Sequence, residues 1–424
     1  MKRKFFIAIL AFISQFGLFA QQLTLETCQE KAKANYPLIN QYQLIEKTAD
    51  FNISNAGKNY LPQLTLSAKA SYQSDVTQIP VALGQKFGIE IPVMNKDQYQ
   101  AALEATQLIW DGGLTKTQKG LTKIGAETEK QKLEVDLYTL NERVNQLYFG
   151  ILLLKEQQIQ TDILTMDLQT NHNRLKALMI NGIASQADLD ALKVEMINAE
   201  QHKADLKSIT KTYYLMLSAL TGLNITEKND IIKPEIDLSV LRDSSNHRPE
   251  LKLFEKQSQT IEMQKKLLVA GNLPKIGAYF QGGYGQPGLN MFLAGFSPFY
   301  IGGIRFSWNI SGLYTQGNNL KKLDLSKKSV EIQKETFLFN NNLLTKQQQN
   351  SIEMLISNIE NDEKIIELRQ NIKKSTTAKL ENGTANVNDL IRDLNAENQA
   401  KQQKAIHEIQ LLNNIYQLKN SVNN

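Results

Sequence analysis

The change of pattern that decides the fold lies in one stretch, Leu61-Pro62-Gln63-Leu64-Thr65-Leu66-Ser67-Ala68-Lys69-Ala70-Ser71-Tyr72-Gln73. Pro62 ends the helical pattern before it, because proline lacks the N–H of a helix interior and clashes with the preceding turn. From Leu64 onward apolar and polar residues alternate, which is the period of a β-strand. The stretch therefore predicts a helix that ends at Leu61 and a strand that follows at once.

The same switch occurs again 212 residues later, at Leu273-Pro274-Lys275-Ile276. Three further pairs of segments recur in the same order: residues 36–39 with 248–251, 109–114 with 307–313, and 181–184 with 382–385. Matched landmarks at nearly constant spacing indicate a duplication. We therefore divide the chain into residues 1–20, a first helix–strand–helix repeat (21–222), a linker (223–243) and a second repeat (244–424).

The segments between each proline and the following tryptophan predict four strands in all. Besides 64–73, residues 99–106 and 300–310 alternate with period two. Between Ile276 and Leu320 the only charge is Arg305, and ten of the 23 glycines lie there. Ten aromatic residues lie between Ile276 and Tyr314. This composition favours a lipid-facing wall with aromatic girdles; the alternative is the core of a soluble β-subdomain.

Four strands cannot close a barrel, since bacterial single-chain barrels begin at about eight. Open sheet edges do not occur in lipid, because their unpaired backbone groups have no water to bond. If the strands lie in a membrane, several chains must therefore share one barrel.

Residues 114–180 contain no proline, and at 1.5 Å per residue they predict a helix of roughly 100 Å. Leu140, Val144, Leu147, Ile151 and Leu154 form one apolar stripe, which we expect Ile159, Ile163 and Met166 to continue; in the second repeat the stripe is Ile352, Leu355, Ile356 and Ile359. A narrow stripe on a polar helix is typical of paired helices wetted on one side. A solvated coiled-coil rod would give the same pattern.

The N-terminus predicts a secretory signal peptide over residues 1–20. Lys2, Arg3 and Lys4 precede an apolar run that ends in Leu18-Phe19-Ala20; the alternative is an uncleaved membrane anchor. Without these three residues the formal charge falls from +5 to +2, so nucleic acid is not implied as a partner. Cys28, the single cysteine, is interpreted as a buried or incidental thiol.

Residues that could carry catalysis or hold a metal or cofactor do not form a recognisable pattern. His172, His202, His247 and His407 are scattered without metal-ligand spacing. We interpret Gly282-Gly283-Tyr284-Gly285 as strand bends or bulges, since no phosphate-binding loop pattern surrounds it. We expect no enzyme, no metal and no cofactor.

The ordered set of motifs resembles the TolC outer-membrane factor family. It comprises Leu23-Thr24-Leu25-Glu26, Tyr36-Pro37, Leu61-Pro62-Gln63-Leu64, Trp110-Asp111-Gly112-Gly113 and Asn181-Gly182, followed by the second series. The resemblance implies a mostly α chain whose long hairpins form a periplasmic α-barrel. It also implies a homotrimer that shares a twelve-stranded outer-membrane β-barrel. Such a duct of a Gram-negative bacterium works with a periplasmic adaptor and an inner-membrane pump in efflux or type I secretion.

The resemblance also implies a gate at the hairpin tips, with turns at Asn181-Gly182 and Asn382-Gly383. Acids that ring the aperture in the family correspond here to Asp389 and to position 392, which is Arg392, with Asp393 beside it; a latch acid corresponds to Asp188. The latch tyrosine and arginine of the family fall at Leu380 and Ala385, a departure that weakens the latches. For Asp188 and Asp389 the other interpretation is a helix N-terminal acid that stabilises the dipole.

Two other functions fit parts of the pattern. A structural or adhesive coiled-coil stalk, anchored in the outer membrane, needs no lumen. A passive porin does not need helices of this length.

Overall fold

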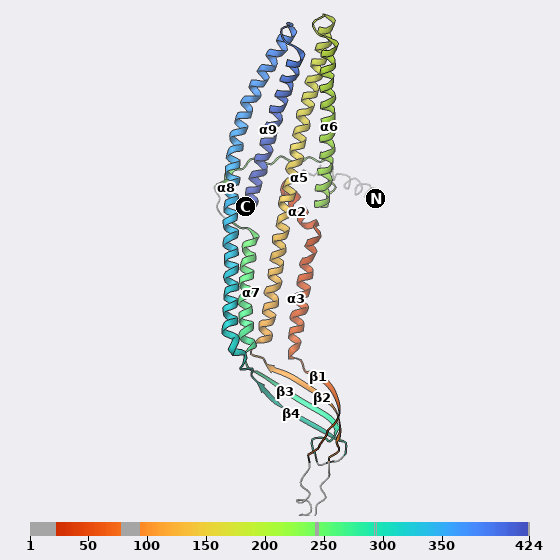
Figure 1. The fold of residues 1–424 in the computed structure, drawn as a ribbon, viewed down its shortest axis with the longest axis vertical. Coiled ribbons are helices and arrows are strands. Elements are labelled where there is room, and N and C mark those ends of the chain that lie inside the picture. Colours follow the sequence, from red (N-terminus) through yellow and green to blue (C-terminus); the bar gives the residue numbers. More distant parts are fainter. Residues whose placement is uncertain (1–22, 78–93, 242–245, 292, 294, 423–424) are drawn as a thin grey trace, which may run out of the picture. The chain divides into compact units, whose positions relative to one another are not determined.

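The computed structural model describes residues 23–77, 94–241, 246–291, 293 and 295–422, so the predicted signal peptide lies outside the described residues. In chain order (Figure 1) the elements are α2 (Leu25–Asn35), η2 (Pro37–Asn40), α3 (Gln41–Gly57), η3 (Lys58–Tyr60), β1 (Gln63–Tyr72), β2 (Asp97–Trp110), α5 (Leu114–Ile180), α6 (Gln186–Thr221), η4 (Leu238–Leu241), α7 (Pro249–Gly271), β3 (Lys275–Gln286), β4 (Ser297–Ser307), α8 (Gly312–Glu381) and α9 (Val387–Val422). A helical segment, two strands and two long helices follow one another twice, and the first helical segment is divided into α2 and α3.

The chain forms two compact units, and each combines segments of both predicted repeats. The first unit comprises the chain up to Asn40, Lys132–Leu251 and Glu335–Asn424. The second comprises Gln41–Gln131 and Lys252–Lys334, and it contains all four strands. No helix in the described part of the chain is apolar enough over a sufficient length to cross a membrane.

The single helix predicted to reach Leu61 is instead divided at Pro37. Helix α2 ends at Asn35, η2 begins at Pro37 and α3 begins at Gln41. Tyr36 is extended, at φ −66° and ψ 127°, because the proline ring disfavours the helical conformation of the residue before it. The equivalent Pro249 is the first residue of α7, where its missing N–H costs nothing.

The apolar stripe of α5 is buried as predicted from Leu140 to Leu154, but its predicted continuation is wrong. Ile159, Ile163 and Met166 are 50%, 38% and 71% exposed, whereas Thr161, Leu168 and Leu175 are buried. Residue 159 lies five positions after Leu154, which rotates it well away from the stripe on a 3.6-residue helix. Positions 161, 168 and 175 follow at intervals of seven and stay on the same face. In α8, Ile352 and Leu355 are buried as predicted.

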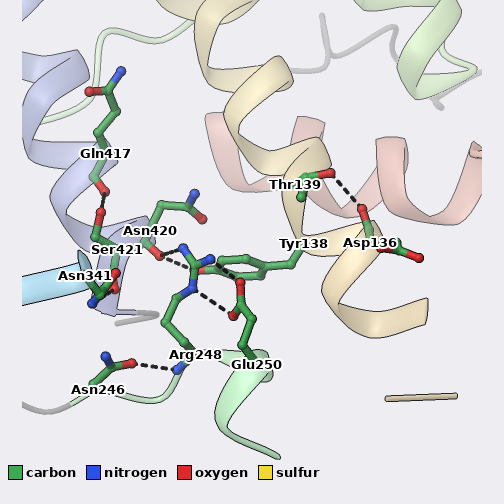
Figure 2. A network of polar contacts seen from close by, with 10 residues as sticks. All are labelled: Asp136, Tyr138, Thr139, Asn246, Arg248, Glu250, Asn341, Gln417, Asn420 and Ser421. Atoms are coloured by element: carbon green, nitrogen blue, oxygen red, sulfur yellow. Dashed lines mark hydrogen bonds and ion pairs between the residues drawn. The ribbon is translucent and has the colours of Figure 1, made fainter. Parts of the chain in front are cut away.

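The last carbonyls of α9 accept hydrogen bonds from side chains of the first unit (Figure 2). The Tyr138 hydroxyl donates to the Asn420 carbonyl at 2.6 Å, and Arg248 also donates to it at 3.3 Å. Asn341 donates to the carbonyl of residue 421 at 2.9 Å. The Arg248 guanidinium, ion-paired with Glu250, lies 5.0 Å from the Tyr138 ring centroid. A cation at this end also stabilises the helix dipole.

Candidate functional site: a one-faced sheet and two hairpin tips

The second unit holds one antiparallel sheet in the order β1-β2-β3-β4. The register places apolar side chains of all four strands on one face, interrupted by Gln107 and, at the end away from the helices, by Asp97 and Gln286. These residues are Leu64, Leu66, Ala68, Ala70, Tyr72, Tyr99, Ala101, Leu103, Ala105, Ile276, Ala278, Phe280, Gly282, Tyr284, Pro298, Tyr300, Gly302, Ile304 and Phe306. Leu66, Tyr300 and Ile304 are 80%, 74% and 75% exposed. This large apolar face has no cover within the described chain, which is characteristic of an interaction surface.

The opposite face is mostly polar. It carries residues such as Ser67, Lys69, Gln100, Glu104 and Arg305. A sheet with one apolar and one polar face is the pattern of a barrel wall between lipid and water.

Aromatic side chains lie at both ends of the apolar face. Phe296 stacks on Tyr99 and Tyr284, with ring centroids 6.2 and 5.6 Å apart. At the helix end, a bulge between Leu108 and Trp110 inserts one residue into β2. Because of this extra residue, Trp110 lies opposite Ile276, and its indole is on the apolar face.

The spacing between these aromatic ends matches a membrane. Tyr99 and Trp110 are 11 residues apart, which is roughly 36 Å along a strand. Tilted by about 40°, such a strand spans roughly 28 Å, close to the about 25 Å apolar band of outer-membrane barrels.

Residues Gly282 to Gly285 are not bends or bulges, which corrects the interpretation from sequence. The register runs unbroken through them against both β2 and β4. A Cβ at Gly283 would overlap the Phe299 ring and the Ala101 carbonyl oxygen. Glycine is therefore needed at position 283 because the neighbouring ring and backbone leave no room for a Cβ. Strand β4 also ends at Ser307, so the predicted alternation through Ile310 extends three residues too far.

The first hairpin tip joins α5 to α6 through Asn181 and Gly182. Gly182 has φ +74°, a conformation that favours glycine, and Ile183 N–H donates to the Leu178 carbonyl at 3.0 Å. Ser185 and Asp188 form a reciprocal capping box: each backbone N–H donates to the other's side chain, at 2.9 and 3.2 Å. Asp188 thus stabilises the start of α6.

The second tip joins α8 to α9 by the same geometry through Asn382 and Gly383. Gly383 has φ +71°, and Asp389 N–H donates to the Asn386 side chain at 2.8 Å. The second tip differs from the first in having Arg392, which pairs with Asp389 at 3.1 Å and with Asp393 at 3.2 Å. Asp393 is buried and accepts a hydrogen bond from Thr376 at 2.6 Å.

One apolar cluster packs the two tips together. It comprises Leu168 and Leu175 of α5, Leu189, Leu192 and Ala199 of α6, Leu380 of α8, and Val387, Leu390 and Leu394 of α9. Arg174 pairs with Glu381 at 3.2 Å, and Asn395 donates to Glu195 at 3.2 Å. The structure therefore brings Asp188, Asp389, Arg392 and Asp393 into one hairpin bundle.

A buried charge network beside the second tip was not predicted. Lys373 of α8 pairs with Glu397 of α9 at 2.6 Å and with Asp167 of α5 at 3.0 Å. Burial raises the pKa of Glu397, but hydrogen bonds from Lys373 and Lys401 outweigh it, so the pKa lies below its ordinary value. The sequence does contain an indication of this network, since the acidic residues Asp393 and Glu397 lie among the buried apolar residues of α9.

Groups of residues that could hold a metal are not found in the described part of the chain. Cys28 is buried, and burial raises the pKa of its thiol to about 11. That thiol stays protonated near neutral pH and is unreactive.

Comparison with known proteins gives the fold. No protein-family model matches the sequence, and a search of curated proteins finds no match. Among solved structures, the outer membrane protein VceC of Vibrio cholerae is similar at TM-score 0.66 and 14% identity, covering 94% of each chain. The MtrE outer membrane channel of Neisseria gonorrhoeae in its open state is similar at TM-score 0.65 and 14% identity, covering 94% of this chain and 88% of that one. The CmeC outer membrane channel of Campylobacter jejuni gives 0.64 and 13%, covering 94% and 85%.

The chain therefore has the fold of these outer-membrane channels, with long helical hairpins joined to a four-stranded, one-faced sheet. More particularly, the chain has the fold of the TolC-like outer-membrane factors, as the order of its motifs predicts.

Proposed function

We propose that this protein is the outer-membrane duct of a tripartite efflux or type I secretion system in a Gram-negative bacterium. The exposed apolar face of the sheet carries the proposal, because it has the length, aromatic ends and polar reverse side of a barrel wall. The likeness in fold to outer-membrane channels supports it.

The free edges of the sheet support a barrel shared between copies. Strands β1 and β4 each pair on one side only within the described chain. In lipid those edges need partners, and a second and third copy supply them without leaving an edge open. We therefore propose a homotrimer with twelve strands, whose polar face lines a water-filled lumen and whose helices continue the duct into the periplasm. The four-segment division of the chain at residues 20, 222 and 243 belongs to the same proposal.

The hairpin tips are the proposed gate. Asp188 and Asp389 are fixed at equivalent first-turn positions, and Arg392 partly neutralises Asp389. With Asp393, the four residues carry a net charge of −2 per copy. Convergence of three copies near one axis would favour cations and narrow the aperture through fixed charge. The periplasmic adaptor and the inner-membrane pump are proposed as partners, and the pump would select the solute.

Current through the purified full chain in planar lipid bilayers tests the proposal. A duct gives stepwise conductance, whereas a coiled-coil stalk without a lumen gives none. Replacement of Asp389 tests the gate: Asp389→Ala should leave assembly intact and change single-channel conductance and block by divalent cations. Asp389→Asn is the matched variant, because it removes the charge and keeps an acceptor for the Asn386 N–H. Unchanged conductance and unchanged block in both variants would refute the gate assignment.

A further inference from the structure

A small pocket lies on the polar face of the sheet, at the end nearest the helices. Its volume is about 230 Å³, and its walls include Asn59, Gln63, Lys275, Tyr279, Arg305 and Ser307. The lining offers two cations with amide and hydroxyl donors, and no described residue of the lining is a carboxylate. This set of donors suits an anion.

The two cations are neighbours by strand register. Lys275 of β3 pairs with Ser307, and Arg305 of β4 pairs with Gly277, so both side chains leave the same face two positions apart. Neither forms an ion pair with any described residue. Like charges at neighbouring positions of one face repel each other, and an anion between them would relieve that repulsion.

The Arg305 guanidinium lies over an aromatic ring. It lies 4.8 Å from the centroid of Tyr279, within cation–π range. Gly277, opposite Arg305, has no side chain to cover the pocket, and a Cβ there would lie 3.1 Å from the Gln107 carbonyl oxygen. The contact with Tyr279 thus favours one orientation of the exposed Arg305 guanidinium at the wall of the pocket.

Carboxylates nearby do not neutralise the pair. Glu104 shares the polar face, but it lies four residues along β2 from Leu108, the partner of Gly277, which is roughly 13 Å. The Asp111 carboxylate accepts from the Tyr60 hydroxyl at 2.8 Å and from the Thr115 N–H at 2.7 Å. Among the described residues, no carboxylate lines the pocket, and none forms an ion pair with Lys275 or Arg305.

We propose that this pocket binds the oxyanion group of a solute, a phosphate, sulfate or carboxylate, through Arg305 and Lys275. Arginine presents a planar fork that matches such groups, and the lysine adds a point charge. That the pocket faces a lumen rests on the proposed function. In that case three copies give the strand section six such cations and a preference for anions, opposite in sign to the hairpin tips.

Binding of inorganic phosphate to the full chain in detergent tests the proposal without requiring a channel. Broadening of the phosphorus NMR line on titration at low ionic strength gives the affinity. We expect the double variant Lys275→Gln with Arg305→Gln to weaken binding at least about tenfold, since each charged hydrogen bond contributes about that factor. Arg305→Lys should fall between, because it keeps the charge and loses the fork.

Lys69→Gln is the matched control, since Lys69 is a cation of the same face outside this pocket. Circular dichroism establishes that each variant is folded. Equal binding by the wild type and the folded double variant would overturn the proposal, as would an equal loss in Lys69→Gln. In bilayers under a KCl gradient, the double variant should shift the reversal potential toward cation preference. Absence of any current would refute the duct and leave the phosphate result standing.

Discussion

Replacement of Ile304 by arginine distinguishes a lipid-facing sheet from a sheet in water. Ile304 lies on the apolar face of β4, 75% exposed. It is two residues from Gly302, which pairs with Phe280 midway between the aromatic ends, so in a bilayer it lies roughly 5 Å from the midplane. Arginine at that depth costs about 2 kcal/mol per copy. A barrel of three copies would lose about 6 kcal/mol, or roughly 10⁴-fold in the assembly equilibrium. In water the same exposed substitution changes stability by no more than about 0.5 kcal/mol.

Ile301→Arg is the matched control, because Ile301 belongs to the same strand and the opposite face. We expect it to assemble like the wild type, since in the proposed barrel its side chain would meet water in the lumen. Refolding of the purified chain from urea into lipid vesicles, followed by heat-modifiable migration in gels, measures assembly. Equal assembly of the Ile304→Arg and Ile301→Arg variants would contradict the assignment of the two faces.

Two further predictions concern the first unit. Arg248→Ala removes the partner of the largely buried Glu250 and a donor to the end of α9, and should lower the free energy of unfolding by about 2 to 3 kcal/mol. Thermal unfolding in detergent measures this, and Arg248→Lys should lose less stability. Equal stability of Arg248→Ala and wild type would refute the role of this contact. The lowered pKa of Glu397 means that its contribution is fully present above its ordinary pKa of 4.5 and is lost as the pH falls through the folded value. Glu397→Gln should therefore flatten the acid limb of the unfolding midpoint below pH 4.5, and an acid limb identical to wild type would refute this.

The sequence predicted the features that depend on local chemistry. Pro62 and Pro274 each lie between a helical segment and the strand that follows, although α3 ends at Gly57 and α7 at Gly271. Gly182 and Gly383 make the tip turns, and the long helix over 114–180 has the predicted bounds. These positions constrain the backbone by themselves, so no distant contact is needed to place them.

The features that sequence reasoning missed depend on contacts between distant segments. The stripe of α5 passes through Thr161, a polar residue that hydrophobicity alone does not mark. The bulge before Trp110 follows from pairing with β3. Lys373 and Glu397 are 24 positions apart, and only the packing of α8 on α9 joins them. Arg305 stands out in the sequence as a lone charge, but its proximity to Lys275 follows only from the pairing of β3 with β4.

The most direct test of the central claim, that one face of the sheet lines a water-filled duct, uses adjacent cysteines on β1. Ser67→Cys and Leu66→Cys, each with Cys28 replaced by serine, place a thiol on the polar and the apolar face. A charged, membrane-impermeant thiol reagent is added while current through single channels is recorded. The account predicts that the reagent lowers the current of the Ser67→Cys protein and leaves that of the Leu66→Cys protein unchanged. The opposite pattern, or no current from either protein, would contradict it.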